Sequence, residues 1–540
     1  MAADDKEWEL EEGIPQVVDP FIQQYLKGRD SLILQEQKQR HDFNLRKALT
    51  PVAAKACKIV SQIRDRELTR ASTPTYGPPA LDWEQARKTD LWKIAQRMPK
   101  GSLLNASIHG LINVDKLIDV ALTTEGLHIS SPRPLSSQEA REESPVTFQY
   151  ASSSKQSVEG GVSIWSAAYS ASELVPIQQA VSSFPDGGET GFREWSKRRC
   201  TPGDEQSSDA RRGALMIINS LLSYEPILRL CLRDVFAHLA ADGVDYAEFR
   251  HTFSHPYRRE GTDPPDEDQS EWCHVFQQEL RRFQNTDEGR GFYGARIIWT
   301  ASRSLSNREI ADNMQTCLFA KYDYPEVISG FDISGTGRDA RPLSDLVPLL
   351  FWFRKECMDA GLEIPFLFHA GETSRDGSRG DQDLYDAILL GTRRICEGST
   401  LYKHPLLTES VKEKKILVEF NPTSSRSEHI LPALLSRGVS VALSGSSFNG
   451  RGAEGFTQVI WRVLQGDDDH TDLAGLAMLV ENSIRWSCYD DQPAGEWLSE
   501  IGEGILGEKV KARRLQDWWA RFEQFCEWVA VTFAEEGSDE

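Results

Sequence analysis

The segment Pro365–Glu372 reads PFLFHAGE, a short apolar run that ends in polar residues. Similar runs recur along the chain with helical stretches between them. They are Gly101–Ser107, Val244–Arg250, Ala295–Ser302, Val327–Gly335, Arg393–Gly398, Ile416–Pro422 and Val439–Ser447. Because parallel strands need crossover connections, strands that alternate with helices predict a parallel sheet. About eight such units favour an α/β fold of the (β/α)8 TIM-barrel type.

The alternative fold is a doubly wound open sheet. Such folds that bind dinucleotides carry a Gly-x-Gly-x-x-Gly motif at the first turn from strand to helix. No such motif opens the first turn of this chain. The barrel is therefore the preferred prediction.

Composition and charge argue against two classes of binding partner. The chain has 540 residues, of which 39% are hydrophobic and 26% charged, and its formal net charge is -21. A strongly negative surface repels nucleic-acid phosphates and anionic lipids, so we expect neither nucleic acid nor a membrane as partner. The acidic N-terminus lacks the apolar region of a secretory signal, and the nine cysteines are scattered without a Cys-x-x-Cys pair. These features predict reduced thiols and a cytoplasmic location.

The predicted domain organisation has three parts. Residues 1–90 form an N-terminal helical extension. Residues 91–510 form the barrel, with an insertion at about 128–210 after the first strand, and residues 511–540 form a C-terminal helix and an acidic tail. The apolar spacing within Asp19–Arg70 predicts two amphipathic helices. They either pack on the main body or act as an arm for homodimer formation.

The polar composition of Ser130–Gly161, rich in Ser, Pro, Glu and Gln, predicts a mobile insertion or linker. Glu260–Gln269 has the composition of an exposed loop.

Catalytic groups of a parallel barrel lie at the carboxyl ends of its strands. The run quoted above ends in His369 and Glu372, which could supply a metal ligand and a general acid or base. Each residue also has a simpler interpretation. His369 could merely form a hydrogen bond inside the barrel mouth, and Glu372 could be a neutral buried carboxyl or a partner of Arg375.

Several segments occur in a characteristic order. They are Met98–Gly101 (MPKG), Gly330–Gly335 (GFDISG), His369–Thr373 (HAGET), Tyr402–Pro405 (YKHP) and the Trp-rich stretch Trp518–Trp528. Together they resemble the adenosine deaminase-related growth factor family, in its fungal intracellular form, within the adenosine/AMP deaminase superfamily. The resemblance implies a barrel of the metal-dependent hydrolases and a zinc-dependent adenosine aminohydrolase. It implies His369 as a metal ligand, Glu372 as the catalytic proton donor and the Gly335 backbone N–H as a substrate-binding group.

The sequence departs from the family at most other site positions. The family's His-x-His is Asn105 and Ser107 here, and the acidic residue just beyond it is His109. The family's Gly-His-Gly is Cys396–Gly398, and its Ser-Asp-Asp-Pro is Gly445–Phe448. Amides and hydroxyls are poor zinc ligands beside imidazole and carboxylate, so we expect no cofactor. Zinc would need an alternative shell, for which the candidates are His109, His369, Glu372 and Glu397.

These departures leave three hypotheses for function. The first is a pseudo-deaminase that binds a small nucleoside-like molecule or a protein partner, with Asn105, Ser107, His369 and Ser446 clustered as a relic metal site. The second is an enzyme of specialised metabolism that uses the barrel mouth without zinc, with His109, Cys396 and Glu397 among its titratable groups; Cys396 could equally be an inert buried thiol. The third is a zinc-dependent adenosine deaminase.

Overall fold

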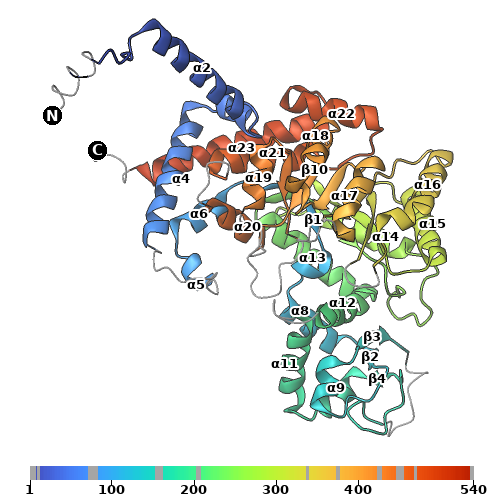
Figure 1. Cartoon of the computed structure of the whole chain (residues 1–540). Coiled ribbons are helices and arrows are strands. Elements are labelled where there is room, and N and C mark those ends of the chain that lie inside the picture. The colour runs from blue at the N-terminus through green and yellow to red at the C-terminus, as the bar shows by residue number, and fades with distance from the viewer. Residues whose placement is uncertain are drawn as a thin grey trace.

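A barrel of parallel strands forms the centre of the computed structural model (Figure 1), which describes residues 8, 12–70, 83–152, 162–201, 208–335, 340–371, 378–422, 429–445, 455–466 and 471–534. Within this part of the chain, eight strands belong to the barrel. They are β1 (Gly101–Ala106), β5 (Val244–His251), β6 (Gly294–Ser302), β7 (Ile328–Ser334), β8 (Leu367–Ala370), β9 (Arg394–Glu397), β10 (Leu417–Phe420) and β11 (Val441–Leu443).

The strands close into a ring. They form two parallel sheets, in the orders β1-β5-β6-β7 and β11-β10-β9-β8. A parallel bridge between Phe331 and Phe366 joins β7 to the segment leading into β8. On the other side, the Gly445 N–H donates to the Asn105 carbonyl across 3.3 Å, beyond the ends of β11 and β1. Both seams are joined, so the predicted barrel is confirmed and the open sheet is wrong.

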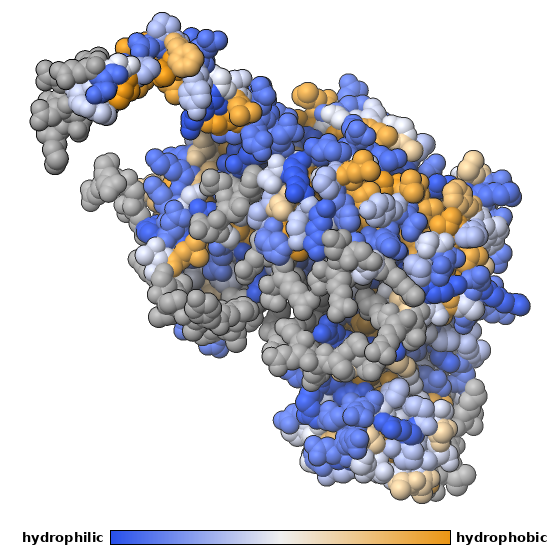
Figure 2. Space-filling view, in the orientation of Figure 1, coloured by the Kyte–Doolittle hydropathy of each residue, from blue (hydrophilic) through white to orange (hydrophobic). Residues whose placement is uncertain are grey.

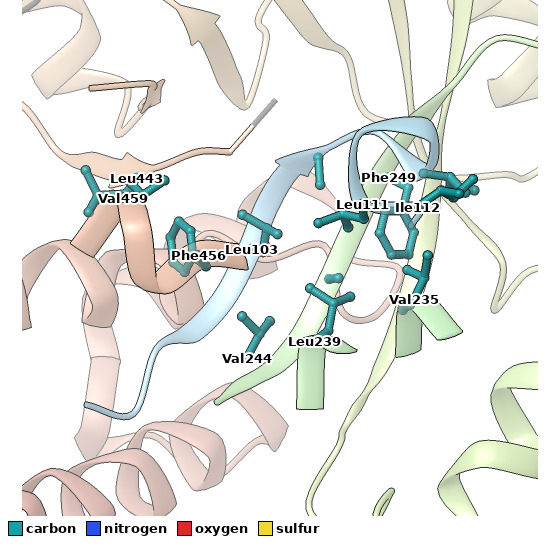
Figure 3. Close-up of a cluster of buried hydrophobic side chains, with 14 of the residues drawn as sticks. Leu103, Leu111, Ile112, Val235, Leu239, Val244, Phe249, Leu443, Phe456 and Val459 are labelled. Carbon is teal, nitrogen blue, oxygen red and sulfur yellow. The ribbon is translucent and has the colours of Figure 1, made fainter. Parts of the chain in front are cut away.

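Helices supply the crossovers that a parallel sheet needs. Their bounds are α13 (Glu225–Ala241), α14 (Ser270–Gln284), α15 (Asn307–Asp323), α16 (Leu343–Asp359), α17 (Arg379–Leu389), α18 (Pro405–Glu413), α19 (Ile430–Ser436), α20 (Gly455–Leu464) and α21 (Leu473–Arg485). Figure 3 shows how the strands pack on this layer: Leu103 and Val244 lie near Phe456 and Leu239, which come from α20 and α13. Every one of these side chains is buried, so the shell between strands and helices is a continuous apolar core.

The N-terminal helices behave in two different ways. Helix α4 (Pro51–Arg70) packs against the long C-terminal helix α23 (Val510–Thr532), with Val60 and Ile63 buried between them and the body. Helix α2 (Pro20–Gln37) has no buried residue and projects away from the barrel (Figure 1). Apolar side chains such as Phe21 and Tyr25 are exposed along it (Figure 2). The expectation that both helices pack on the body is therefore wrong for α2.

The insertion after β1 is a folded lobe. Strands β2 (Leu127–Ser130), β3 (Thr147–Tyr150) and β4 (Val175–Pro176) form an antiparallel sheet in the order β3-β2-β4. Helices α9 (Gln138–Glu143), α10 (Ile177–Ser182) and α11 (Gly188–Cys200) complete it, and α7 (Ile108–Leu111), α8 (Val114–Thr123) and α12 (Ser208–Leu222) connect it to the barrel. A linker over Ser130–Gly161 was the wrong interpretation for the residues described there; residues 153–161 lie outside the described part.

The lobe has an aromatic core, which explains why a polar-looking segment folds. Trp165 packs edge-on against Phe184 and Trp195, with ring centroids 4.9 and 5.5 Å apart. The Trp165 indole N–H donates to the Ala180 carbonyl, so the buried ring has no unpaired donor. By contrast, Glu260–Gln269 is the exposed loop that its composition predicts.

The remaining elements cover the outside of the barrel. They are α3 (Phe43–Ala48), α5 (Trp83–Ala86), α6 (Asp90–Arg97), η2 (Leu401–Lys403), α22 (Ala494–Glu503) and η3 (Gly504–Leu506). In the part of the chain that the structure describes, no helix combines the length and the apolar character needed to cross a bilayer.

Candidate functional site

The interior of the barrel holds buried charged side chains beside an apolar cluster that includes Leu104, Ile298 and Leu417. Branched apolar residues are usual inside TIM barrels, whereas the charged side chains are not. Arg394 of β9 pairs with Glu248 of β5 and Glu419 of β10, at 2.6 and 2.5 Å, and all three side chains have no exposed surface. Arg394 also donates to the Trp486 carbonyl, and Glu248 accepts from the Cys488 N–H. The guanidinium thus joins three strands to the loop that closes the bottom of the barrel.

Arg250 continues this network upward. Its Nη2 lies 2.8 Å from Glu419, its Nη1 lies 2.8 Å from Asp332, and its Nε donates to the side-chain oxygen of Asn105 at 3.0 Å. The two carboxylates offset the burial of the guanidinium and raise the pKa of Arg250 above its ordinary value. We call this ion-paired set, Glu248, Arg250, Asp332, Arg394 and Glu419, the barrel floor.

Above the barrel floor lies His369, at the end of β8. Its Nδ1 is 2.6 Å from Asp332, whose other oxygen accepts from the His369 backbone N–H. Burial alone would raise the pKa of Asp332, but His369 and Arg250 outweigh it, so this pKa lies below its ordinary range. A carboxylate on Nδ1 fixes the ring and assigns Nε2 to any further partner. The side chain is 17% exposed, so His369 lies at the mouth.

Arg303 contacts both Gly335, predicted to bind substrate, and His369, predicted to bind metal. From the end of β6 its guanidinium donates to the Ile333 carbonyl at 2.9 Å and to the His369 carbonyl at 2.5 Å, and it pairs with Asp383 of α17. Its backbone N–H donates to Ser334, and a Cβ on Gly335 would lie 3.4 Å from the Cβ of Arg303. Gly335 and His369 are thus held on the same end of the barrel by one buried arginine.

The positions of the first metal motif hold neutral groups. Asn105 is 1% exposed, and its amide nitrogen donates to the Cys396 thiol at 2.8 Å while its oxygen accepts from Arg250. Ser107 follows β1 and is 8% exposed. The structure therefore brings Asn105 and Cys396 into contact, and it connects Asn105 to His369 through Arg250 and Asp332.

The other predicted site residues are placed differently. Glu397 ends β9 with a φ of 74°, which is the left-handed region that side chains other than glycine rarely adopt. Glu372, Arg375, Ser446 and Ser447 lie outside the described residues, so their part in the site remains a prediction.

Two histidines lie toward the joint between barrel and lobe. His251, at the end of β5, stacks on Trp272 with ring centroids 4.7 Å apart. Burial lowers the pKa of His251 to about 3, with a smaller contribution from nearby His109, and burial lowers the pKa of His109 to about 4. Both imidazoles are neutral at physiological pH, so His109 is a neutral group where the resemblance implies an acidic one.

The donor set does not fit zinc in the described part of the chain. At the described positions that match the family's zinc ligands, Asn105 and Ser107 offer an amide and a hydroxyl, and His369 offers an imidazole. Among the described residues, no group of three or more His, Cys, Asp or Glu side chains has an arrangement that could hold a metal ion. A structural or catalytic zinc site needs three or four such ligands.

Sequence reasoning missed Arg250, Arg303, Asp332 and Arg394. A signal was present, because charged side chains inside short apolar strands are rarely buried without a partner. Their partners lie tens to hundreds of residues away along the chain, as with Arg250 and Glu419. The local sequence pattern therefore does not reveal which residues form these ion pairs.

A comparison with solved structures supports the barrel fold described above. No protein-family model matches the chain. The fold matches an amidohydrolase from Burkhoderia ambifaria solved with bound zinc, with a TM-score of 0.51 and 16% identity over 82% of this chain and 96% of that one. The chain has the α/β barrel fold of the amidohydrolases.

Sequence similarity is more specific. The chain is 24% identical to human (Homo sapiens) adenosine deaminase 2 over 482 residues, which is 86% of each chain. It is 23% identical to adenosine deaminase 2-A of Danio rerio, over 78% of this chain and 83% of that one. Over most of its length, the chain is similar in sequence to the adenosine deaminase 2 proteins.

Proposed function

We propose that this protein is a pseudo-deaminase of the fungal intracellular type, which binds a small purine-like molecule at the barrel mouth without zinc and without deaminating it. The observation that carries the proposal is the amide of Asn105, whose oxygen and nitrogen are both engaged by Arg250 and Cys396. Homology to adenosine deaminase 2 supports the ligand class. The nine cysteines are all buried free thiols, which supports a role in the reducing cytoplasm.

Ligand recognition in this proposal uses Gly335 and Glu372, because binding a purine needs a donor and a proton-bearing carboxyl but no metal. Catalysis would need more. Without a metal, water keeps a pKa near 15.7 instead of about 7, so very little hydroxide is available at neutral pH. Without a positioned base the water is not activated either, and a base contributes about 10² to 10⁴ in rate.

The test combines three measurements on one preparation: zinc content by elemental analysis, inosine formation from adenosine, and nucleoside affinity by calorimetry. We expect substoichiometric zinc, no turnover and measurable binding. Turnover that a Glu372→Gln substitution abolishes would restore the zinc-dependent deaminase as the function.

Two matched variants test whether Gly335 contributes to nucleoside affinity. A Cβ at position 335 would make only ordinary contacts, the nearest at 3.4 Å, so Gly335→Ala keeps both the fold and the N–H. Gly335→Pro removes the N–H, and we expect it to weaken nucleoside binding about tenfold, the size of one hydrogen bond. Equal affinities of the two variants would contradict the assigned role of Gly335.

One observation favours a second candidate, an enzyme that works without zinc. Glu397 is held at φ 74° at the mouth, and strained backbone of this kind is concentrated at functional sites. The discriminating experiment incubates the protein with nucleosides and follows them by mass spectrometry. A product that Glu397→Gln abolishes, with no metal present, would establish the enzyme; unchanged nucleosides favour the binding protein.

We also propose that α2 mediates homodimer formation. An isolated helix of 18 residues is marginal in water, and α2 exposes Phe21, Tyr25 and Leu32 without a buried contact. Light scattering after size-exclusion chromatography should give a dimer for the full chain and a monomer for Phe21→Ser/Tyr25→Ser. The matched control Gln24→Ser/Lys27→Ser, also on α2, should remain a dimer. A monomeric full chain would contradict the proposal.

A further inference from the structure

A cavity of about 530 Å³ lies between the lobe and the outside of the barrel. Helices α8, α13 and α14 form most of its walls (Figure 1). Of these, α8 connects the lobe to the barrel, whereas α13 and α14 are crossover helices outside the ring of strands, so the cavity is separate from the barrel mouth. Ligand sites usually have volumes of about 300–1,000 Å³, so a small organic molecule fits this space.

The walls of the cavity are mainly apolar. Their apolar side chains include Leu117, Val120, Leu230, Cys231, Ala237 and Phe283. Burial raises the pKa of the Cys231 thiol to about 12, so this group is uncharged at neutral pH. Leu230 is 44% exposed although it lines a concave space. A ligand that covers Leu230 removes apolar surface from water, which favours binding.

The charges around the cavity balance one another. The charged side chains that line it are Lys116, Asp119, Arg233, Asp234, Arg282 and Glu288, three positive and three negative. Lys116 pairs with Asp234 between α8 and α13, and Arg233 pairs with Glu279 at 2.6 Å. The rim therefore gives no net attraction for an ion, and an ionic ligand would compete with partners already in place.

We propose that this cavity binds an uncharged, mainly apolar small molecule. Such a ligand contacts α8 and α13 at the same time, so it stabilises the joint between lobe and barrel. Because the cavity lies outside the ring of strands, the inference goes beyond the proposed nucleoside binding at the mouth and does not rest on it.

A matched pair of dyes tests the chemical class of the ligand. N-phenylnaphthylamine is uncharged, and anilinonaphthalene sulfonate has the same rings with one negative charge. The fluorescence of both dyes rises in apolar surroundings, so each can be titrated with the full chain. We expect the uncharged dye to bind about tenfold more tightly, because the charged group has to leave water. No saturable binding of the uncharged dye, or equal or tighter binding of the sulfonate, would overturn the inference.

Two pairs of variants test where the uncharged dye binds. Leu230→Asp places a charge in the wall, and its control is Leu389→Asp on α17, where the side chain is 80% exposed and does not line the cavity. Ala237→Phe fills the cavity, and its control is Ala520→Phe at an exposed position of α23.

We expect the cavity variant of each pair to bind the uncharged dye about tenfold more weakly and its control to bind it like the original protein. Loosened proteins also bind such dyes, so Tm is measured for every variant. Leu230 is partly exposed, so we expect Leu230→Asp to fold with a Tm close to that of the original protein. Equal affinities within either pair would show that the dye binds elsewhere and would overturn the inference.

Discussion

The barrel floor and the barrel mouth are made from the same strands but differ in the kind of side chain they hold. In the floor, Arg394 and its two carboxylates are fully buried and every charge has an opposite partner. At the mouth, only a few residues further along the strands, Asn105 and Ser107 are neutral and Glu397 is strained. An uncompensated charge in the floor would destabilise the fold, whereas a lost ligand at the mouth costs activity alone. The barrel floor is therefore expected to tolerate substitution less than the barrel mouth does.

The largest loss of stability is expected when the ion pairs of the barrel floor are disrupted. Arg394→Met leaves Glu248 and Glu419 buried without their shared cation, and we expect a loss of about 3–5 kcal/mol in the free energy of unfolding, measured with urea. Arg290→Met is the matched control, because Arg290 and its partner Asp287 are 84% and 95% exposed, and it should change stability by less than about 0.5 kcal/mol. Similar losses for both variants would show that the floor is not an essential ion-pair network.

A smaller loss of stability is expected from acid, through the buried His251 at the end of β5. The pKa of His251 is about 3 in the folded protein and 6.5 in an exposed chain, so between these values the unfolded chain binds more protons. Stability is therefore full above the unfolded pKa and is lost as pH falls through this window. At about pH 5 the loss is about 2 kcal/mol.

The measurement is Tm between about pH 8 and pH 5. His251→Phe keeps a ring against Trp272 but cannot titrate, so its Tm should fall less steeply with acid. Part of the slope should remain because His109 also has a lowered pKa. A variant whose slope matches the original protein would show that His251 is not the group responsible.

The smallest change in stability is expected when backbone strain at the barrel mouth is relieved. Glu397→Gly removes a side chain held at φ 74°, and we expect a gain of about 1 kcal/mol in stability. Lys415→Gly, at φ 50° and away from the mouth, should give a similar gain without changing nucleoside binding. A loss of stability in Glu397→Gly would mean that contacts of the carboxylate outweigh the strain.

Much of the fold could be predicted because its signal is local. Each of the eight strands lies within or overlaps a predicted apolar run, as β8 does within Pro365–Glu372. The lobe was misjudged because its core consists of a few aromatic residues, such as Trp165 and Trp195, spread over a polar segment. For helix α2 the sequence left two alternatives open, because its apolar spacing predicts an apolar face but not which molecule buries it.

Residue identity alone sets which chemistry is present: an imidazole at 369, an amide at 105, and a thiol at 396. What only the tertiary structure decides is how these groups are used. Asn105 and Cys396 are 291 residues apart in sequence and 2.8 Å apart in space, and Arg250 reaches Glu419 across 169 residues. Closing the ring of strands is what creates these contacts, because a strand's inward side chains meet only when its neighbours, distant along the chain, complete the barrel.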